Sequence, residues 1–278
     1  MRAPLRVCFL LAVLAGRLPA QGVLVAPHSI FIDHRSRGGF VELYNPEARP
    51  VEVTIGTLYG YPVTDSTGQL GLHVIDAPAA SEPSAVAWIV ALPRRMVIQP
   101  LTKQTVRLLG RPPAGLADGE YWARLVISAK AGQLPVAVSG VDSASGIQVG
   151  LNLEVRTIIP VYYRKGAVGT GLTLSDVRTS VEADSIGLRV RLTRTGNAAF
   201  IGTVRGSLRN ETNREVGAFR VPIAVYYQVE PRFALARAGL PPGRYTLHLE
   251  VTAERGDIPP DQLLPVRAVR ASTEIVVR

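Results

Sequence analysis

The chain has 278 residues, a formal net charge of +9, 47% hydrophobic residues and 19% charged residues. This length suits one large domain or two of about 100–150 residues each, and the apolar content excludes a chain that is disordered throughout. Its 26 glycines and 21 prolines indicate frequent turns and no repeat of the collagen type.

Residues 1–20 have the pattern of a secretory signal peptide. Arg2 and Arg6 precede an apolar stretch at residues 7–15, and Ala20 supplies the small residue of a cleavage site. The apolar stretch is too short to span a bilayer, and no later run is long enough to do so. We therefore expect export, cleavage near Ala20 and a mature chain without a membrane span; an uncleaved signal anchor is the alternative.

The only cysteine, Cys8, lies in this N-terminal segment. A chain cleaved near residue 20 would contain no thiol, which excludes a disulfide within the chain, a cysteine nucleophile and a cysteine-based metal site. An exported protein of this kind depends on packing for its stability.

Apolar and polar residues alternate between glycines and prolines, which predicts an all-β fold. The expected strands cover residues 40–44, 50–55, 103–109, 121–127, 187–192, 245–251 and 271–278. One short helix is predicted at residues 232–238. We expect an N-terminal immunoglobulin-like β-sandwich over residues 21–165 and a C-terminal one over residues 171–278, with the boundary near residues 165–170.

Two segments of the chain resemble each other and support this division. Residues 114–129 and residues 238–253 are identical at seven of sixteen positions, among them Tyr121 and Tyr245. A glycine turn followed by a tyrosine that opens a central strand is typical of the tyrosine corner, in which the phenol bonds back to the preceding turn. A chance similarity of two turn–strand units is the alternative.

No residue pattern indicates an enzyme, a cofactor or a metal site. The histidines are His28, His34, His73 and His248, and none has the spacing of a helical metal site. The chain lacks a nucleophile elbow, a phosphate-binding loop and a dinucleotide fingerprint. A pair of carboxylates brought together only by the fold stays open. His248 stands between two leucines of a predicted strand, so we expect it to face solvent.

Apolar and polar residues alternate without a break between residues 147 and 155, and the predicted strand runs on to residue 164, about 18 residues in all. The apolar positions of its first part are Ile147, Val149, Leu151, Leu153 and Val155. Such a strand is apolar along one face. It is either an inner strand of an ordinary sandwich or an edge strand that lends its apolar row and its free backbone groups to a partner.

Five segments in order resemble the first half of the periplasmic chaperone–usher pilus-assembly chaperones, the PapD-like family. They are residues 23–32, 40–46, 92–108, 118–127 and 147–164. The last segment ends in Val-Tyr-Tyr-Arg at residues 161–164, which is similar to the Leu-Phe-Tyr-Arg that precedes the family's domain linker. The second half of the chain is compatible with the family's second sandwich, but its likeness is weaker.

This resemblance implies two immunoglobulin-like domains in an L or boomerang arrangement and a chaperone function without enzymatic activity. In the family, the last strand of the first domain fills the groove of an incomplete pilin by donor-strand complementation. Aligned on residues 162–164, the donor positions fall on Leu151, Leu153 and Val155. The implied partners are a pilin-like or other exported β subunit and an outer-membrane usher.

Two positions depart from the family pattern. The family binds the terminal carboxylate of the pilin with an arginine and a lysine, where this chain has Ser29 and Pro160. Neither residue supplies the cationic donor that a buried carboxylate needs. Arg156 lies four residues before Pro160, on the same face of the predicted strand, and is one substitute for the missing cation. Arg35 or Arg37 could approach from the other side.

The resemblance also assigns Arg164 to the junction that ties the two domains together. A second class of function is a periplasmic or cell-surface structural or adhesive protein of tandem immunoglobulin-like domains. Nucleic acid is not an expected partner, because the basic residues are spread out and are not interleaved with stacking aromatic residues.

Overall fold

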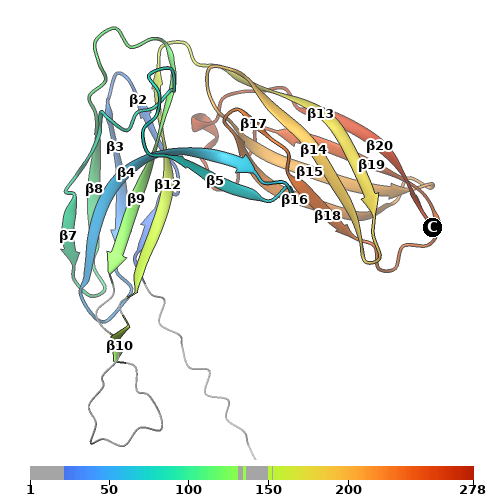
Figure 1. Cartoon of the computed structure of the whole chain (residues 1–278), viewed down its shortest axis with the longest axis horizontal. Helices are drawn as coiled ribbons and strands as arrows, with labels where there is room; N and C mark the ends of the chain where they lie inside the picture. Colours follow the sequence, from blue (N-terminus) through green and yellow to red (C-terminus); the bar gives the residue numbers. More distant parts are fainter. Residues whose placement is uncertain (1–21, 131–133, 136–149, 152) are drawn as a thin grey trace, which may run out of the picture.

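The computed structural model describes residues 22–130, 134–135, 150–151 and 153–278. Strands dominate this part of the chain and form two β-sandwiches set at an angle to each other (Figure 1). The predicted all-β class and the L-shaped pair of sandwiches are confirmed. Within the described ranges, no helix is long and apolar enough to cross a membrane.

The first sandwich consists of two sheets that enclose one apolar core. One sheet has the order β1 (Leu24–Ala26), β3 (Gly38–Tyr44), β8 (Lys103–Gly110), β6 (Ile89–Leu92). The other has the order β2 (Ile30–Asp33), β12 (Glu154–Lys165), β9 (Gly119–Lys130), β4 (Val51–Thr64), β5 (Leu70–Ile75), and β7 (Arg95–Ile98) pairs with β4. A two-stranded ladder of β10 (Leu134–Pro135) and β11 (Gly150–Leu151) lies apart from both.

Sequence alternation explains which residues this core contains. Val41 and Leu43 on β3 lie next to Val106 and Leu108 on β8, and all four are fully buried. The residues between them face solvent, as a period of two requires in a strand with one covered face.

The second sandwich is built in the same way around its own core. One sheet contains β13 (Thr170–Val181), β14 (Ser185–Gly196), β17 (Gln228–Val229) and β18 (Arg232–Ala236). The other has the order β16 (Glu215–Val225), β15 (Phe200–Asn210), β19 (Gly243–Thr252), β20 (Val269–Val277). A 3-10 turn at Pro260–Gln262 precedes the last strand.

The predicted helix at residues 232–238 is wrong. Residues 232–236 form β18, which pairs with β14 in antiparallel register. Phe233 and Leu235 are buried in the second core, and the residues between them are exposed. Apolar side chains at every second position match a strand, and the ladder with β14 satisfies its backbone groups.

Both predicted tyrosine corners are confirmed. The Tyr121 hydroxyl donates to the Ala117 carbonyl at 3.0 Å, and the Tyr245 hydroxyl donates to the Pro241 carbonyl at 2.7 Å. Each bond reaches back four residues to the turn before a central strand, β9 or β19.

A third apolar cluster fills the junction between the two sandwiches. Trp122 of β9 packs edge-on against Tyr226 at 4.5 Å between ring centroids, and Tyr162 of β12 lies in the same cluster. The β4–β5 hairpin crosses to the second sandwich (Figure 1), where the Glu230 N–H donates to the Thr64 hydroxyl at 2.8 Å. A junction with buried aromatic rings and hydrogen bonds restricts relative domain motion.

Candidate functional site

Strand β12 has one edge that is only partly covered. It pairs with β9 along its whole length, whereas β2 pairs only with its last part, from Val161 opposite Ile30 to Arg164 opposite Asp33. In the described part of the chain, no strand pairs with residues 154–160 on the β2 side. These residues form an open edge, which is a template for pairing with another chain.

The backbone groups that face this edge follow from one hydrogen bond. The His34 N–H donates to the Arg164 carbonyl at 2.9 Å, so the backbone groups of Arg164 point toward the β2 side. The N–H and C=O of one strand residue point to the same side, and the side changes at each residue. The N–H and C=O groups of Glu154, Arg156 and Ile158 therefore point to the open edge.

Pro160 lies two residues after Ile158, so its backbone faces the same side of the strand. The N–H that a proline lacks would therefore have pointed to the open edge. The ladder with β9 loses no donor at this position, which explains how a proline fits within a twelve-residue strand. Ile30 pairs with Val161, and Ser29 is therefore the neighbour of Pro160 at the point where β2 joins the edge. Ser29 and Pro160 are thus the residues that directly precede the first pair of this ladder.

The predicted apolar row is only partly described. Ile147 and Val149 lie outside the described residues, and Leu151 is described only by its backbone pairing with Leu134. β12 itself begins at Glu154, so the unbroken strand expected over residues 147–164 is not seen as such. Leu153 is half-buried.

Val155 shares its strand face with the core residues Ile159 and Val161. Its side chain lies against Gly22, where an added Cβ would be 3.3 Å from Val155 Cγ1. Val155 therefore points toward the end of its own sandwich. Donation of the row of residues 147–155 to a partner remains a prediction.

The opposite face of β12 borders the open edge with a small apolar surface. Ile158 is 41% exposed and pairs in register with Val126 of β9. In the neighbouring row of paired residues, Leu58 of β4 stands opposite Arg124 of β9. A segment added to the edge would find apolar side chains on this face as well as free backbone groups.

Arg124 is a site residue that sequence reasoning missed. It pairs in register with Pro160 and is only 8% exposed. Its Nε donates to the Gly60 carbonyl at 3.0 Å, and its guanidinium lies 5.0 Å from the Tyr226 ring centroid. Its Nη2 is buried and has no hydrogen-bond partner among the described residues. The available signal was an arginine in the middle of the apolar strand at residues 121–127.

Of the three arginines proposed as substitute cations, Arg156 lies on the open edge itself, and Arg35 and Arg37 lie away from it. Arg156 donates from Nε to Glu154 at 2.8 Å, and this bond holds the pKa of the Glu154 carboxyl below its usual value. Arg35 and Arg37 lie in the turn after β2, at the opposite end of that strand from Ser29. Arg124 is therefore the basic residue that shares a register row with Pro160.

Arg164 links residues of both sandwiches. Its Nε donates to Glu120 Oε2 at 2.8 Å, and its Nη1 donates to the Gln262 carbonyl at 2.6 Å. Glu120 is buried, and its other oxygen accepts bonds from Trp122 Nε1 at 2.8 Å and from the Ala199 N–H at 2.9 Å. This carboxylate is thus satisfied by donors from both sides of the junction.

A second carboxylate at the junction accepts bonds from two phenols. Glu82 Oε2 accepts from Tyr59 at 2.8 Å and from Tyr227 at 2.5 Å. Burial and these contacts raise the pKa of Tyr227 to about 12 and the pKa of Tyr59 well above its usual range.

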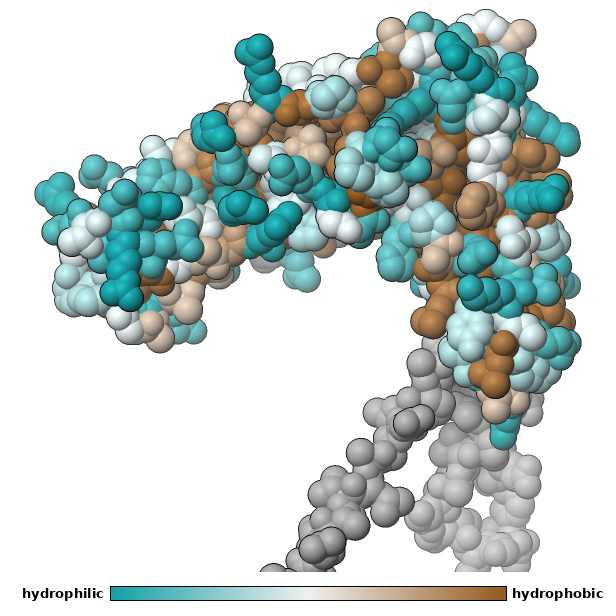
Figure 2. All heavy atoms as spheres, turned by 180° about the vertical axis from the view of Figure 1, so that it is seen from behind, coloured by the Kyte–Doolittle hydropathy of each residue, from teal (hydrophilic) through white to brown (hydrophobic). Residues whose placement is uncertain are grey.

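Metal-binding side chains do not gather in the described ranges. These ranges contain no group of three or more histidine, cysteine or acidic residues placed to hold a metal ion. His248 is exposed between the buried Leu247 and Leu249, as its place in the strand predicts. Figure 2 shows polar side chains at the free end of the second sandwich and more apolar surface along the first.

Comparison with known proteins gave no sequence match and several structural ones. No family model matches the chain. No curated protein matches it either. The CsuC–CsuE chaperone–tip adhesion subunit complex of Acinetobacter baumannii is similar at a TM-score of 0.46 and 13% identity, over 90% of this chain and 97% of that one.

Two further solved structures resemble the chain. The CupB2 chaperone of Pseudomonas aeruginosa is similar at a TM-score of 0.40 and 12% identity, over 91% of this chain and 100% of that one. The SafA pilin–SafB chaperone complex of Salmonella enterica is similar at a TM-score of 0.42 and 12% identity, over 90% and 95%. Similarity at this level describes a resemblance and does not assign a function.

Proposed function

We propose that this protein is a periplasmic chaperone that binds an exported β subunit along the open edge of β12. The observation that carries this proposal is the edge at residues 154–160, which overlaps the end of the alternating apolar row at residues 147–155. An added strand would use the free backbone groups of the edge, while the apolar row would fill a groove in the client.

The position of β2 limits where such a client strand can run. From Val161 onward, β2 occupies the edge, so an added strand has to stop beside Ser29 and Pro160. If the client strand runs parallel to β12, its carboxyl end reaches this point. We infer that a terminal carboxylate is neutralised here by Arg124, the basic residue in register with Pro160, whose buried guanidinium turns from the Gly60 carbonyl toward the edge when a client binds.

Site-specific photo-cross-linking tests this proposal on the full exported chain. A photoreactive phenylalanine replaces Ile158, on the face beside the edge, or Val276, a matched exposed apolar residue of the edge strand β20. We expect the 158 probe, and not the 276 probe, to attach to the C-terminal segment of an exported β protein. Equal labelling from both positions would contradict edge binding.

Charge substitution then tests the apolar row. In the Leu151→Asp/Leu153→Asp variant, burying two charges in a client groove costs several kcal/mol, and a tenfold loss of binding requires only about 1.4 kcal/mol. We expect the cross-link at 158 to disappear while the melting temperature is kept. The Val181→Asp/Val276→Asp variant, at exposed positions of the second sandwich, should keep both.

Two results would overturn the donor-strand reading. Unfolding of the first sandwich in the Leu151→Asp/Leu153→Asp variant would mean that the row belongs to an ordinary core. A folded variant that still captures the client would mean that binding does not use the row. The alternative function, a structural or adhesive protein of tandem sandwiches, predicts no client-specific cross-link at 158.

A further inference from the structure

The outer face of the sheet β16-β15-β19-β20 carries a row of charged residues that the proposed function does not use. Arg205 of β15 stands in register with Arg220 of β16 on one side and with Glu250 of β19 on the other. Glu250 in turn stands opposite Arg270 of β20. We call these four residues the arginine row; neighbouring strands are about 4.8 Å apart.

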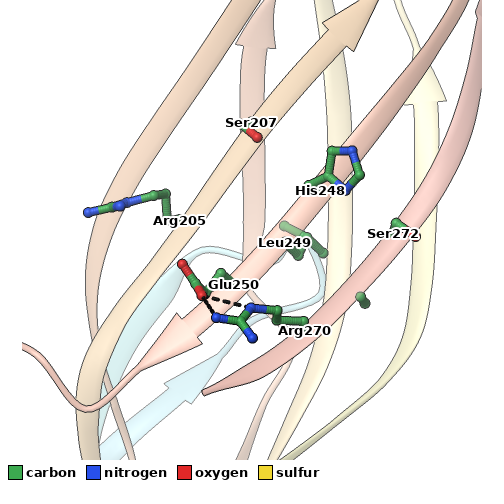
Figure 3. A pocket seen from close by; sticks show the side chains of 8 residues that line it. Arg205, Ser207, His248, Leu249, Glu250, Arg270 and Ser272 are labelled. Atoms are coloured by element: carbon green, nitrogen blue, oxygen red, sulfur yellow. Dashed lines mark hydrogen bonds and ion pairs between the residues drawn. The ribbon is translucent and has the colours of Figure 1, made fainter. Parts of the chain in front are cut away.

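The charges of the arginine row do not balance. Glu250 is engaged by Arg270, which donates to its Oε1 from Nε at 2.8 Å and from Nη2 at 2.5 Å. Figure 3 shows this pair and the Arg205 side chain directed away from it. Among the described residues, Arg205 and Arg220 form no ion pair. Like charges directly opposite each other on a sheet are destabilising.

Small polar residues leave space around these two guanidinium groups. A shallow depression of about 410 Å³ lies on one side of Arg205, with Ser207 and His248 in its lining. A second depression of about 430 Å³ lies on the other side, between Arg205, Ser207 and Arg220, and its lining also includes Phe219 and the carboxylate residue Glu215. The Ser207 hydroxyl is therefore shared by both, and Figure 3 shows it beside His248 on the next strand.

This arrangement fits a ligand with several negatively charged oxygens. A guanidinium presents a planar fork of donors that matches phosphate oxygens, and two forks on adjacent strands can bond to different oxygens of one tetrahedral group. We propose that Arg205 and Arg220 bind a phosphate group, with the Ser207 hydroxyl as a further hydrogen-bonding partner. The group is either inorganic phosphate or a phosphate monoester on a sugar.

Amide chemical-shift titration of the full chain at constant ionic strength tests this site. We expect saturable shifts centred on residues 205, 207 and 220 with inorganic phosphate or with glucose 6-phosphate. The compound that binds more tightly identifies whether the site takes free phosphate or a sugar phosphate. Arg205→Gln and Arg220→Gln should each weaken binding at least tenfold. Arg209→Gln, an arginine of the same strand and face bonded to Asn213, should leave it unchanged.

Three results would overturn the proposal. They are shifts that rise linearly without saturation, an equal response to chloride at the same ionic strength, and tighter binding of a glutamate peptide than of either phosphate compound. A thermal melt without ligand adds an independent readout. Removing the repulsion should leave Arg205→Gln and Arg220→Gln at least as stable as the parent chain, and a clear loss of stability would show a structural role instead.

Discussion

Arg164 and Glu120 form a 2.8 Å ion pair at the junction of the two sandwiches, with the Glu120 side chain fully buried. Removing Arg164 leaves a buried carboxylate without its cation, which typically destabilises a protein by about 3–5 kcal/mol. We expect Arg164→Ala to lower the free energy of unfolding by about 3 kcal/mol in urea denaturation.

A surface pair provides the control for this change. Arg95 and Glu52 are 3.7 Å apart and largely exposed. Arg95→Ala should lower the free energy of unfolding by less than about 1 kcal/mol. Equal effects of the two substitutions would mean that the junction pair is no stronger than a surface contact.

The phenols at the junction predict a loss of stability in alkali. The pKa of Tyr227 is raised from 10.0 to about 12, so the folded chain keeps a proton that the unfolded chain loses above pH 10. This stabilisation is complete below pH 10 and is lost as the pH rises toward about 12, by up to about 1.4 kcal/mol per pH unit for one such group.

Melting temperatures measured between pH 9 and 12, together with the tyrosinate absorbance, test this prediction. The Tyr59→Phe/Tyr227→Phe variant should lose less stability over this range than the parent chain. The other tyrosines supply the remaining pH dependence in both. Parallel curves for the two proteins would be incompatible with the raised pKa values of Tyr59 and Tyr227.

The tyrosine corners predict two small and separable losses. Tyr121→Phe and Tyr245→Phe each remove one hydrogen bond to a turn carbonyl, and each should cost about 1 kcal/mol of stability. Hydrogen exchange should localise the first loss to β9 and the second to β19. Tyr44→Phe serves as the control, since its hydroxyl makes no hydrogen bond to any residue that the structure describes.

Arg124 should matter more for binding than for folding. Arg124→Met keeps an unbranched side chain against Tyr226 and removes a buried Nη2 without a partner among the described residues. We expect its free energy of unfolding to stay within about 1 kcal/mol of that of the parent chain, because relief of an unsatisfied buried donor, which costs about 1–3 kcal/mol, offsets the lost bond to the Gly60 carbonyl.

Calorimetry with a client peptide completes this test. A peptide with the sequence of the segment cross-linked at position 158 should bind the parent chain at least tenfold more tightly with a free carboxyl end than with an amidated end. Arg124→Met should abolish this preference. A preference that survives the substitution would assign the carboxylate to another residue.

Local patterns specified part of the strands and turns of this chain. Alternation with a period of two places β3, β8 and β19 correctly, because one covered face selects apolar side chains at every second position. The turn–tyrosine units also followed from local sequence, since each phenol reaches back only four residues. The short segment at residues 232–238 went wrong because its few residues fit a helix locally, and its pairing with β14 is a long-range contact.

Tertiary structure alone decided the edge and the cation beside it. Whether residues 154–160 are paired depends on where β2, more than a hundred residues earlier in the chain, joins β12. Arg124 came next to Pro160 only through the register of β9 with β12. A sequence shows which face of a strand is apolar, whereas its neighbours in a sheet are set by packing between distant segments.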